Sequence, residues 1–171
     1  MSERDPLQYR PCVGAMMVNH QGRAFVGKRI DNKEGDFWQM PQGGVDPGED
    51  LQAALLREVT EETGVTARHV DVVTRLEHEL FYDLPAELQG KLWGGRYRGQ
   101  RQTWFLLRFT GTEADIRLDA WDHPEFCEWK WVDPDLLPEL IVPFKREVYR
   151  TIVDGFRDSL SPISPHSSLR A

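Results

Sequence analysis

The fold is decided by residues 43–65, which read GGVDPGEDLQAALLREVTEETGV. The stretch from residue 41 to 48 is rich in glycine and proline, so we expect a shaped loop there and no regular element. From residue 49 to 63 the apolar side chains return at helical spacing. Asp50 can cap the start of this helix, and Gly64 stands where a helix would stop. The sequence therefore predicts a loop followed at once by a helix.

Three glutamates share one face of that helix. At 3.6 residues per turn, Glu61 and Glu62 lie within about 60° of Glu58, one on either side of it. Like charges at this spacing repel by a few tenths of a kcal/mol per pair, so something should compensate for them. Hard divalent cations take oxygen ligands and bridge phosphate oxygens, which suits a polyphosphate site beside the glycine-rich loop. The alternative is that the three carboxylates simply solvate an exposed face.

Composition limits the class of protein. The chain has 171 residues, of which 40% are hydrophobic, enough to fill one core without metal or disulfide staples. A net charge of -7 argues against a broad nucleic-acid surface, so stable binding of duplexes is not expected. No apolar run approaches the roughly 20 residues that cross a bilayer, and the first ten residues lack a secretory signal. We expect no membrane role and a cytoplasmic location, with Cys12 and Cys127 reduced and buried.

The remaining elements follow from periodicity and turn residues. A hairpin through Gln21-Gly22 is expected to join the first two strands, and the glycine-rich stretch before residue 102 is expected to be a mobile loop. Strands in mixed order with helices predict an α/β or α+β sandwich. We expect a flexible N-terminus over residues 1–8, one domain over 9–160 and a disordered tail over 161–171. The expected strands are 12–19, 23–29, 70–82, 102–110 and 127–132, and a closing helix is expected at 144–160.

The spacing over residues 43–65 resembles the Nudix box, matching each of its fixed positions. The resemblance implies a hydrolase with an α/β/α sandwich around a mixed sheet, in which Glu58, Glu61 and Glu62 bind Mg²⁺ or Mn²⁺. It also implies that Glu61 or Glu62 helps to deprotonate water. Other box positions are expected to shape the loop or support the metal site: Gly43, Gly44, Gly48, Glu49, Arg57 and Gly64.

Blocks outside the box resemble the branch that contains bacterial RNA pyrophosphohydrolases and plant-type dinucleoside polyphosphate hydrolases. In that branch a glutamate after proline, here Glu125, completes the metal site or acts as the base. Tyr82 and Phe144 become candidates to stack on a base, although core packing is an alternative for Phe144. Basic residues become candidates for phosphate contacts: Arg10, Arg29, Lys145 and Arg146.

The resemblance leaves several functions open. The leading hypothesis is removal of pyrophosphate from 5′-triphosphorylated RNA, which leaves a 5′-monophosphate. The alternative is hydrolysis of diadenosine tetraphosphate to ATP and AMP, and the insert with Arg96 and Arg98 resembles the plant-type enzymes as much as the bacterial ones. A sanitising hydrolase of free nucleotides and a non-catalytic nucleotide sensor are weaker possibilities, the latter because all three box glutamates are present.

Overall fold

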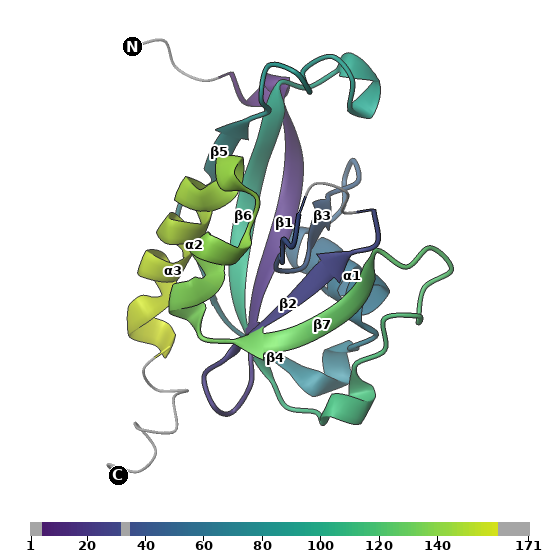
Figure 1. Cartoon of the computed structure of the whole chain (residues 1–171), viewed down its shortest axis with the longest axis vertical. Helices are drawn as coiled ribbons and strands as arrows, with labels where there is room; N and C mark the ends of the chain where they lie inside the picture. Colours follow the sequence, from purple (N-terminus) through teal and green to yellow (C-terminus); the bar gives the residue numbers. More distant parts are fainter. Residues whose placement is uncertain (1–4, 32–34, 161–171) are drawn as a thin grey trace.

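A seven-stranded mixed sheet forms the centre of the computed structural model, which describes residues 5–31 and 35–160 (Figure 1). The strand order is β4-β6-β1-β2-β7, with β3 paired to β1 and β5 paired to β6. Three helices flank the sheet: α1 (Leu51–Thr63), α2 (Leu137–Leu140) and α3 (Arg146–Leu160). The strands are β1 (Tyr9–Val18), β2 (Ala24–Arg29), β3 (Gln42–Gly44), β4 (Val70–Arg75), β5 (Leu80–Asp83), β6 (Gly99–Phe109) and β7 (Phe126–Val132).

Both faces of the sheet are covered, because the central strands are apolar on both sides. Along β1, Ala15 and Met17 pack on the α1 side, whereas Met16 and Val18 pack on the side of α2 and α3. The helices α2 and α3 therefore cover one face and α1 covers the other (Figure 1). The predicted α/β/α sandwich is confirmed.

The parallel pairing of β1 with β6 makes the sheet mixed, since the other pairs are antiparallel. Its register places Arg10 beside Gln100 and Cys12 beside Gln102. On its other side, the same part of β1 pairs with β3, where Cys12 lies opposite Gly44. The start of β1, the start of β6 and β3 thus meet at one end of the sheet, which is where the site forms.

The box helix begins and ends as the sequence predicts. The Asp50 side chain accepts a hydrogen bond from the Ala53 N–H at 3.0 Å, which satisfies a donor of the first turn. Gly64 closes the helix in the left-handed region at φ 77°, which a glycine adopts without the steric cost of a Cβ.

Several expectations about elements are wrong. The stretch 70–82 forms two strands, β4 and β5, because they pair with different halves of the long strand β6. The stretch 41–48 contains a regular element after all, since β3 pairs with β1 over three residues. The last helix begins at Arg146, and residues 143–145 form a separate 3-10 turn. Cys127 is exposed, because it lies on the edge strand β7, while Cys12 is buried.

Other expectations hold or fall outside the structure. The hairpin of β1 and β2 is confirmed, with Val18 opposite Ala24. Trp104 of β6 is fully buried in the core. In the described part of the chain, no helix is long and apolar enough to cross a bilayer. The predicted tail, 161–171, and the first half of the predicted N-terminus, 1–4, lie outside the described residues.

Candidate active site

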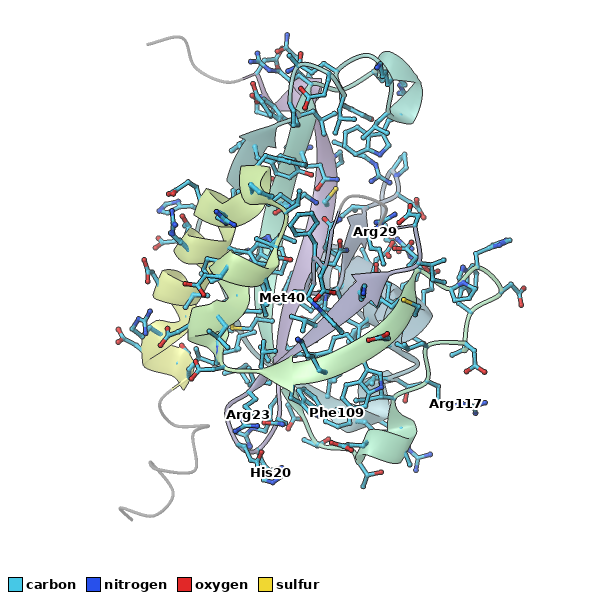
Figure 2. The ribbon with its side chains drawn as sticks, viewed as in Figure 1. His20, Arg23, Arg29, Met40, Phe109 and Arg117 are labelled. Carbon is cyan, nitrogen blue, oxygen red and sulfur yellow. The ribbon has the colours of Figure 1, made fainter. Side chains whose placement is uncertain are left out.

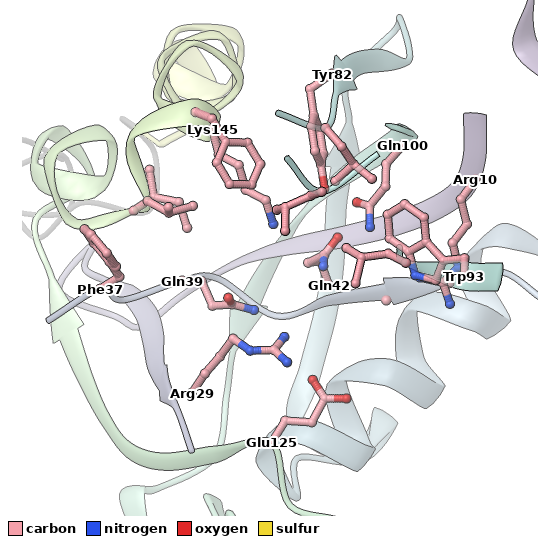
Figure 3. Close-up of a pocket in the computed structure, with 18 of the residues that line it drawn as sticks. Arg10, Arg29, Phe37, Gln39, Gln42, Tyr82, Trp93, Gln100, Glu125 and Lys145 are labelled. Atoms are coloured by element: carbon pink, nitrogen blue, oxygen red, sulfur yellow. The ribbon is translucent and has the colours of Figure 1, made fainter. Parts of the chain in front are cut away.

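A cavity of about 720 Å³ opens where β3, the start of β1 and the turn before α3 meet (Figure 3). Its wall contains acidic, basic and aromatic side chains from segments far apart in the sequence. Figure 3 shows Arg29 and Glu125 reaching in from one side and Lys145 from the other. The predicted site residues that line it are Arg10, Arg29, Gly43, Gly44, Glu58, Tyr82, Glu125, Phe144 and Lys145.

The carboxylates of α1 extend from the cavity wall into the protein. Glu62 is only 2% exposed, and one of its oxygens accepts a hydrogen bond from the Gln42 N–H of β3 at 3.0 Å. Its other oxygen, Oε1, is buried and receives no hydrogen bond from any described residue. Burial, followed by the nearby charges of Glu125 and Glu58, raises the pKa of Glu62 well above its ordinary value.

Glu58 forms part of the same acidic cluster. Burial raises its pKa, and the carboxylates of Glu61 and Glu125 act in the same direction, whereas the neighbouring Arg57 opposes them. Glu125 is exposed and approaches from the loop before β7. The fold therefore brings a glutamate from outside the box close to Glu58 and Glu62 on α1.

Arg57 ties the loop of the box to its helix. It donates to the Gly44 carbonyl at 3.0 Å and holds both oxygens of Glu49, at 2.8 and 2.9 Å. This pairing lowers the pKa of Glu49 to about 2. Arg57 also forms ion pairs with Glu58 at 2.9 Å and Glu61 at 3.6 Å, which offset the repulsion predicted for the helix face.

The glycines of β3 allow a close approach. A Cβ at Gly43 would collide with the carboxylate of Glu58, and a Cβ at Gly44 would collide with the guanidinium of Arg10. The strand therefore passes so close to the Glu58 carboxylate and the Arg10 guanidinium that neither position 43 nor position 44 has room for a side chain.

Basic groups occupy the rest of the wall. Burial, followed by the positive charge of Arg29, lowers the pKa of Lys145 to about 8. Arg29 makes two hydrogen bonds with Asp31, at 2.8 and 3.0 Å, which fix its guanidinium beside the cavity. A phosphate chain in the cavity could therefore meet Lys145 on one side, and Arg29 beside the acidic cluster on the other.

Two aromatic rings lie next to Lys145. The rings of Tyr82 and Phe144 are 5.9 Å apart and tilted by 50°, and the Lys145 Nζ lies 5.3 Å from the Tyr82 ring centre. Phe144 is 37% exposed, so its role is not that of a core residue. The 3-10 turn at residues 143–145 explains this, because it turns Phe144 and Lys145 into the cavity before α3 begins.

The structure does not bring every candidate to the cavity. Arg146 is exposed at the first position of α3 and is absent from the lining, and Glu61 is half-buried beside Arg57. Conversely, Trp93 and Gln42 line the cavity although the sequence reasoning assigned neither a role. The order Trp-Gly-Gly inside the insert is the signal that could have indicated Trp93, since an aromatic residue followed by two glycines belongs to no apolar periodicity of a core element.

The acidic cluster fits a divalent cation. The unpaired, buried Oε1 of Glu62 beside two further carboxylates needs positive charge, and carboxylate oxygens are the ligands that Mg²⁺ and Mn²⁺ prefer. Among the described residues, no three Asp, Glu, His or Cys side chains are already arranged so that they could coordinate a metal ion together. The ion pairs of Arg57 with Glu58 and Glu61 hold two of the carboxylates toward the arginine.

Comparison with known proteins decides the family. A family model described as the NUDIX domain matches residues 8–152. The chain belongs to the Nudix family. The prediction from residues 43–65 of a Nudix hydrolase is thereby confirmed, and hydrolases of this family generally need divalent cations.

Relatives with high identity are similar along nearly their whole length. The RNA pyrophosphohydrolase of Novosphingobium aromaticivorans is 65% identical to this Nudix chain over 152 residues, which are 89% of this chain and 94% of that protein. The RNA pyrophosphohydrolase of Erythrobacter litoralis is 60% identical over 156 residues, covering 91% and 95% of the two chains.

Solved Nudix structures share the fold at low identity. The E. coli dihydroneopterin triphosphate pyrophosphohydrolase superposes with a TM-score of 0.65 at 22% identity, over 85% of this chain and 97% of the other. A binary complex of the C. elegans Ap4A hydrolase gives a TM-score of 0.59 at 18% identity, over 84% and 96%. These likenesses show the fold alone.

Proposed function

We propose that this chain is an RNA pyrophosphohydrolase, which converts 5′-triphosphorylated RNA and water into 5′-monophosphorylated RNA and pyrophosphate. The observation that carries the proposal is the identity of 60–65% with relatives that bear this name, over about nine-tenths of each chain. The cavity supports it, because acidic, basic and aromatic groups suited to a metal, a phosphate chain and a base line the same cavity.

The roles we assign follow from position. Arg10, Arg29 and Lys145 would bind the phosphate oxygens and orient the bond between the first and second phosphates. Phe144 and Tyr82 would stack against the terminal base, an interaction worth about 1–3 kcal/mol. Binding at both ends of the triphosphate would hold the scissile bond over the acidic cluster.

The carboxylates would hold the cation and take the proton. Glu58, Glu61, Glu62 and Glu125 would hold the divalent cation, with Mg²⁺ as the proposed physiological ion. When bound, the cation supplies positive charge to the phosphate oxygens and makes water more acidic. The neighbouring pair Glu62 and Glu125 would accept the proton from the attacking water, since both carboxylates belong to the acidic cluster that would hold the cation.

The test is a direct comparison of substrates with the purified protein and Mg²⁺. A triphosphorylated RNA and diadenosine tetraphosphate are supplied at equal concentrations, and the products are separated by chromatography. We expect pyrophosphate and 5′-monophosphorylated RNA, at a higher kcat/KM than that for the dinucleotide. A ratio that strongly favours the dinucleotide would overturn the RNA assignment, since the wall of Tyr82 and Phe144 also suits an adenosine.

An RNA substrate agrees with the location that the sequence predicts. Triphosphorylated 5′ ends are made by transcription, so a bacterial enzyme that removes them would work in the cytoplasm. Fractionation of cells that express the tagged chain would test this part of the proposal.

A further inference from the structure

The insert between β5 and β6, residues 84–98, forms one wall of the cavity and continues beyond it. Four of its apolar residues face the cavity: Leu84, Leu88, Leu92 and Trp93. On the same insert, a second, open hollow of about 370 Å³ is lined by Arg96, Tyr97 and Arg98, together with Gln8. The insert therefore presents an apolar side to the cavity and a polar, basic side to its surroundings.

Cations and aromatic rings alternate along this insert from the cavity outward. The guanidinium carbon of Arg10, inside the cavity, lies 5.3 Å from the centre of the Trp93 ring. The Trp93 ring meets the Tyr97 ring edge to face at 6.3 Å, and the guanidinium carbon of Arg96 lies 5.6 Å from the Tyr97 ring centre. This series connects a phosphate-binding candidate of the cavity with an exposed arginine outside it (Figure 3 shows its inner end at Arg10 and Trp93).

The charge of the insert differs from that of the whole chain. The insert, residues 84–98, contains three basic residues, Lys91, Arg96 and Arg98, and one acidic residue, Glu87, in a protein whose net charge is -7. Arg98 is ion-paired with Asp83 at 2.6 Å. Lys91 and Arg96 are exposed and form no ion pair with any residue in the described ranges. Two cations are therefore available to a negatively charged partner.

The backbone holds Trp93 in an uncommon conformation. Its φ of 53° lies in the left-handed region, which a bulky aromatic residue rarely adopts, and Gly94 and Gly95 continue in that region at 67° and 74°. Such strain persists where the surroundings fix it, and it is concentrated at ligand sites. Here it places the indole ring between Arg10 and Tyr97.

We propose that the outer side of this insert binds the single-stranded RNA that follows the 5′-terminal nucleotides, with Lys91 and Arg96 on phosphates and Tyr97 against a base. The proposal rests on the RNA substrate proposed above. A cavity of about 720 Å³ has the size of a site for one small ligand, so the rest of an RNA strand must leave it along a wall. Aromatic rings between cations are the arrangement that holds single strands with little regard to sequence.

The experiment compares a short and a long substrate. The kcat/KM is measured for a triphosphorylated dinucleotide and for a triphosphorylated single strand of about 10 nucleotides, which is within the span that such surfaces cover. For the variant with both Arg96→Ser and Tyr97→Leu, we expect the ratio of long to short to fall at least fivefold from that of the unaltered enzyme. The matched control is Arg23→Ser, an equal loss of charge on the hairpin at the opposite end of the molecule (Figure 2).

A binding measurement separates this proposal from the function on which it rests. The affinity for the 5′-monophosphorylated strand of about 10 nucleotides is followed by fluorescence anisotropy against salt. Loss of one phosphate contact should reduce the slope of log K against log salt by about 0.7. The proposal that the insert binds RNA is overturned if the double variant keeps the long-to-short ratio of kcat/KM and the salt slope of the unaltered enzyme. It is also overturned if Arg23→Ser changes both by the same amount. If the unaltered enzyme hydrolyses neither RNA, the proposed function fails, and the slope alone then decides whether the insert binds RNA.

Discussion

Replacing Glu62 with glutamine should make the protein more stable at neutral pH and much less active. Glu62 is buried, accepts one hydrogen bond from the Gln42 N–H and leaves its Oε1 without a donor. Glutamine keeps the shape and the acceptor, removes the buried charge and adds two N–H donors that can face the carboxylate of Glu125. The variant therefore removes the repulsion recorded in the raised pKa of Glu62.

The size of the effect follows from that environment. A buried acceptor left unpaired costs about 1–3 kcal/mol. Since Glu62 can relieve part of this cost by taking up a proton, we expect the free energy of unfolding of Glu62→Gln to exceed that of the unaltered protein by about 1–2 kcal/mol. For a chain of this size each kcal/mol shifts the Tm by about 2–4 °C, so the Tm should rise by about 2–8 °C.

The gain should depend on pH with a definite sign. The folded-state pKa of Glu62 is raised above its unfolded value of about 4.3, so the folded protein binds the proton more tightly. The unaltered protein then loses stability as the pH rises above that unfolded value, until the folded-state pKa is passed. The advantage of glutamine should therefore be near zero below about pH 4 and largest on the alkaline side of the folded pKa.

The assay is thermal unfolding at pH 5 and pH 8 in the presence of a chelator, followed by the same scans with excess Mg²⁺. In chelator the variant should unfold at the higher temperature, and more so at pH 8. With Mg²⁺ the unaltered protein should gain stability by binding, whereas the variant should gain less. The control is Glu139→Gln, the same change at an exposed position of α2. A variant that is less stable at pH 8 in chelator would refute the reasoning about the buried charge.

Two further predictions concern the basic and the glycine-lined walls. Binding of pyrophosphate, measured by calorimetry, should weaken as the pH rises from 7 to 9, because Lys145 has a pKa of about 8 and binds phosphate when protonated. The variant Lys145→Arg should bind pyrophosphate equally well across this range. If its affinity falls as much as that of the unaltered protein, another group causes the pH dependence. Gly43→Ala should lower kcat at least tenfold while retaining the far-ultraviolet circular dichroism spectrum, because the added methyl group displaces the Glu58 carboxylate. Full activity of Gly43→Ala would show that Glu58 does not need its present position.

The sequence predicts the parts of the fold whose signals are local. The cap at Asp50, the stop at Gly64 and the apolar spacing between them define α1 from neighbouring residues alone. The division of residues 70–82 into β4 and β5 could not be predicted in this way, because it depends on which half of β6 each segment joins. The strand β3 could not be predicted for a similar reason. Its two glycines show no alternation of apolar and polar side chains, and it becomes a strand only because it pairs with β1.

The site shows the same division between local and distant information. The spacing of Glu58, Glu61 and Glu62 on one helix face can be read from the sequence, and their neighbour Arg57 does reach the loop. The approach of Glu125 came from family resemblance, because nothing near it in sequence indicates where the loop before β7 folds. The position of Phe144 depends on a 3-10 turn at residues 143–145. The sequence does not reveal this turn, because the apolar pattern of the following helix continues through it.

The parallel pair of β1 and β6 has a consequence for biosynthesis. One edge of β1 can form its hydrogen bonds only after the ribosome has synthesised β6. About 80 residues separate Val18, the end of β1, from Gly99, the start of β6. At 5–20 residues per second, a ribosome needs roughly 4–16 s to synthesise that interval. This edge of the nascent β1 therefore lacks its partner strand for about half of translation, and a fragment that ends before residue 99 should need a chaperone to stay free of aggregates.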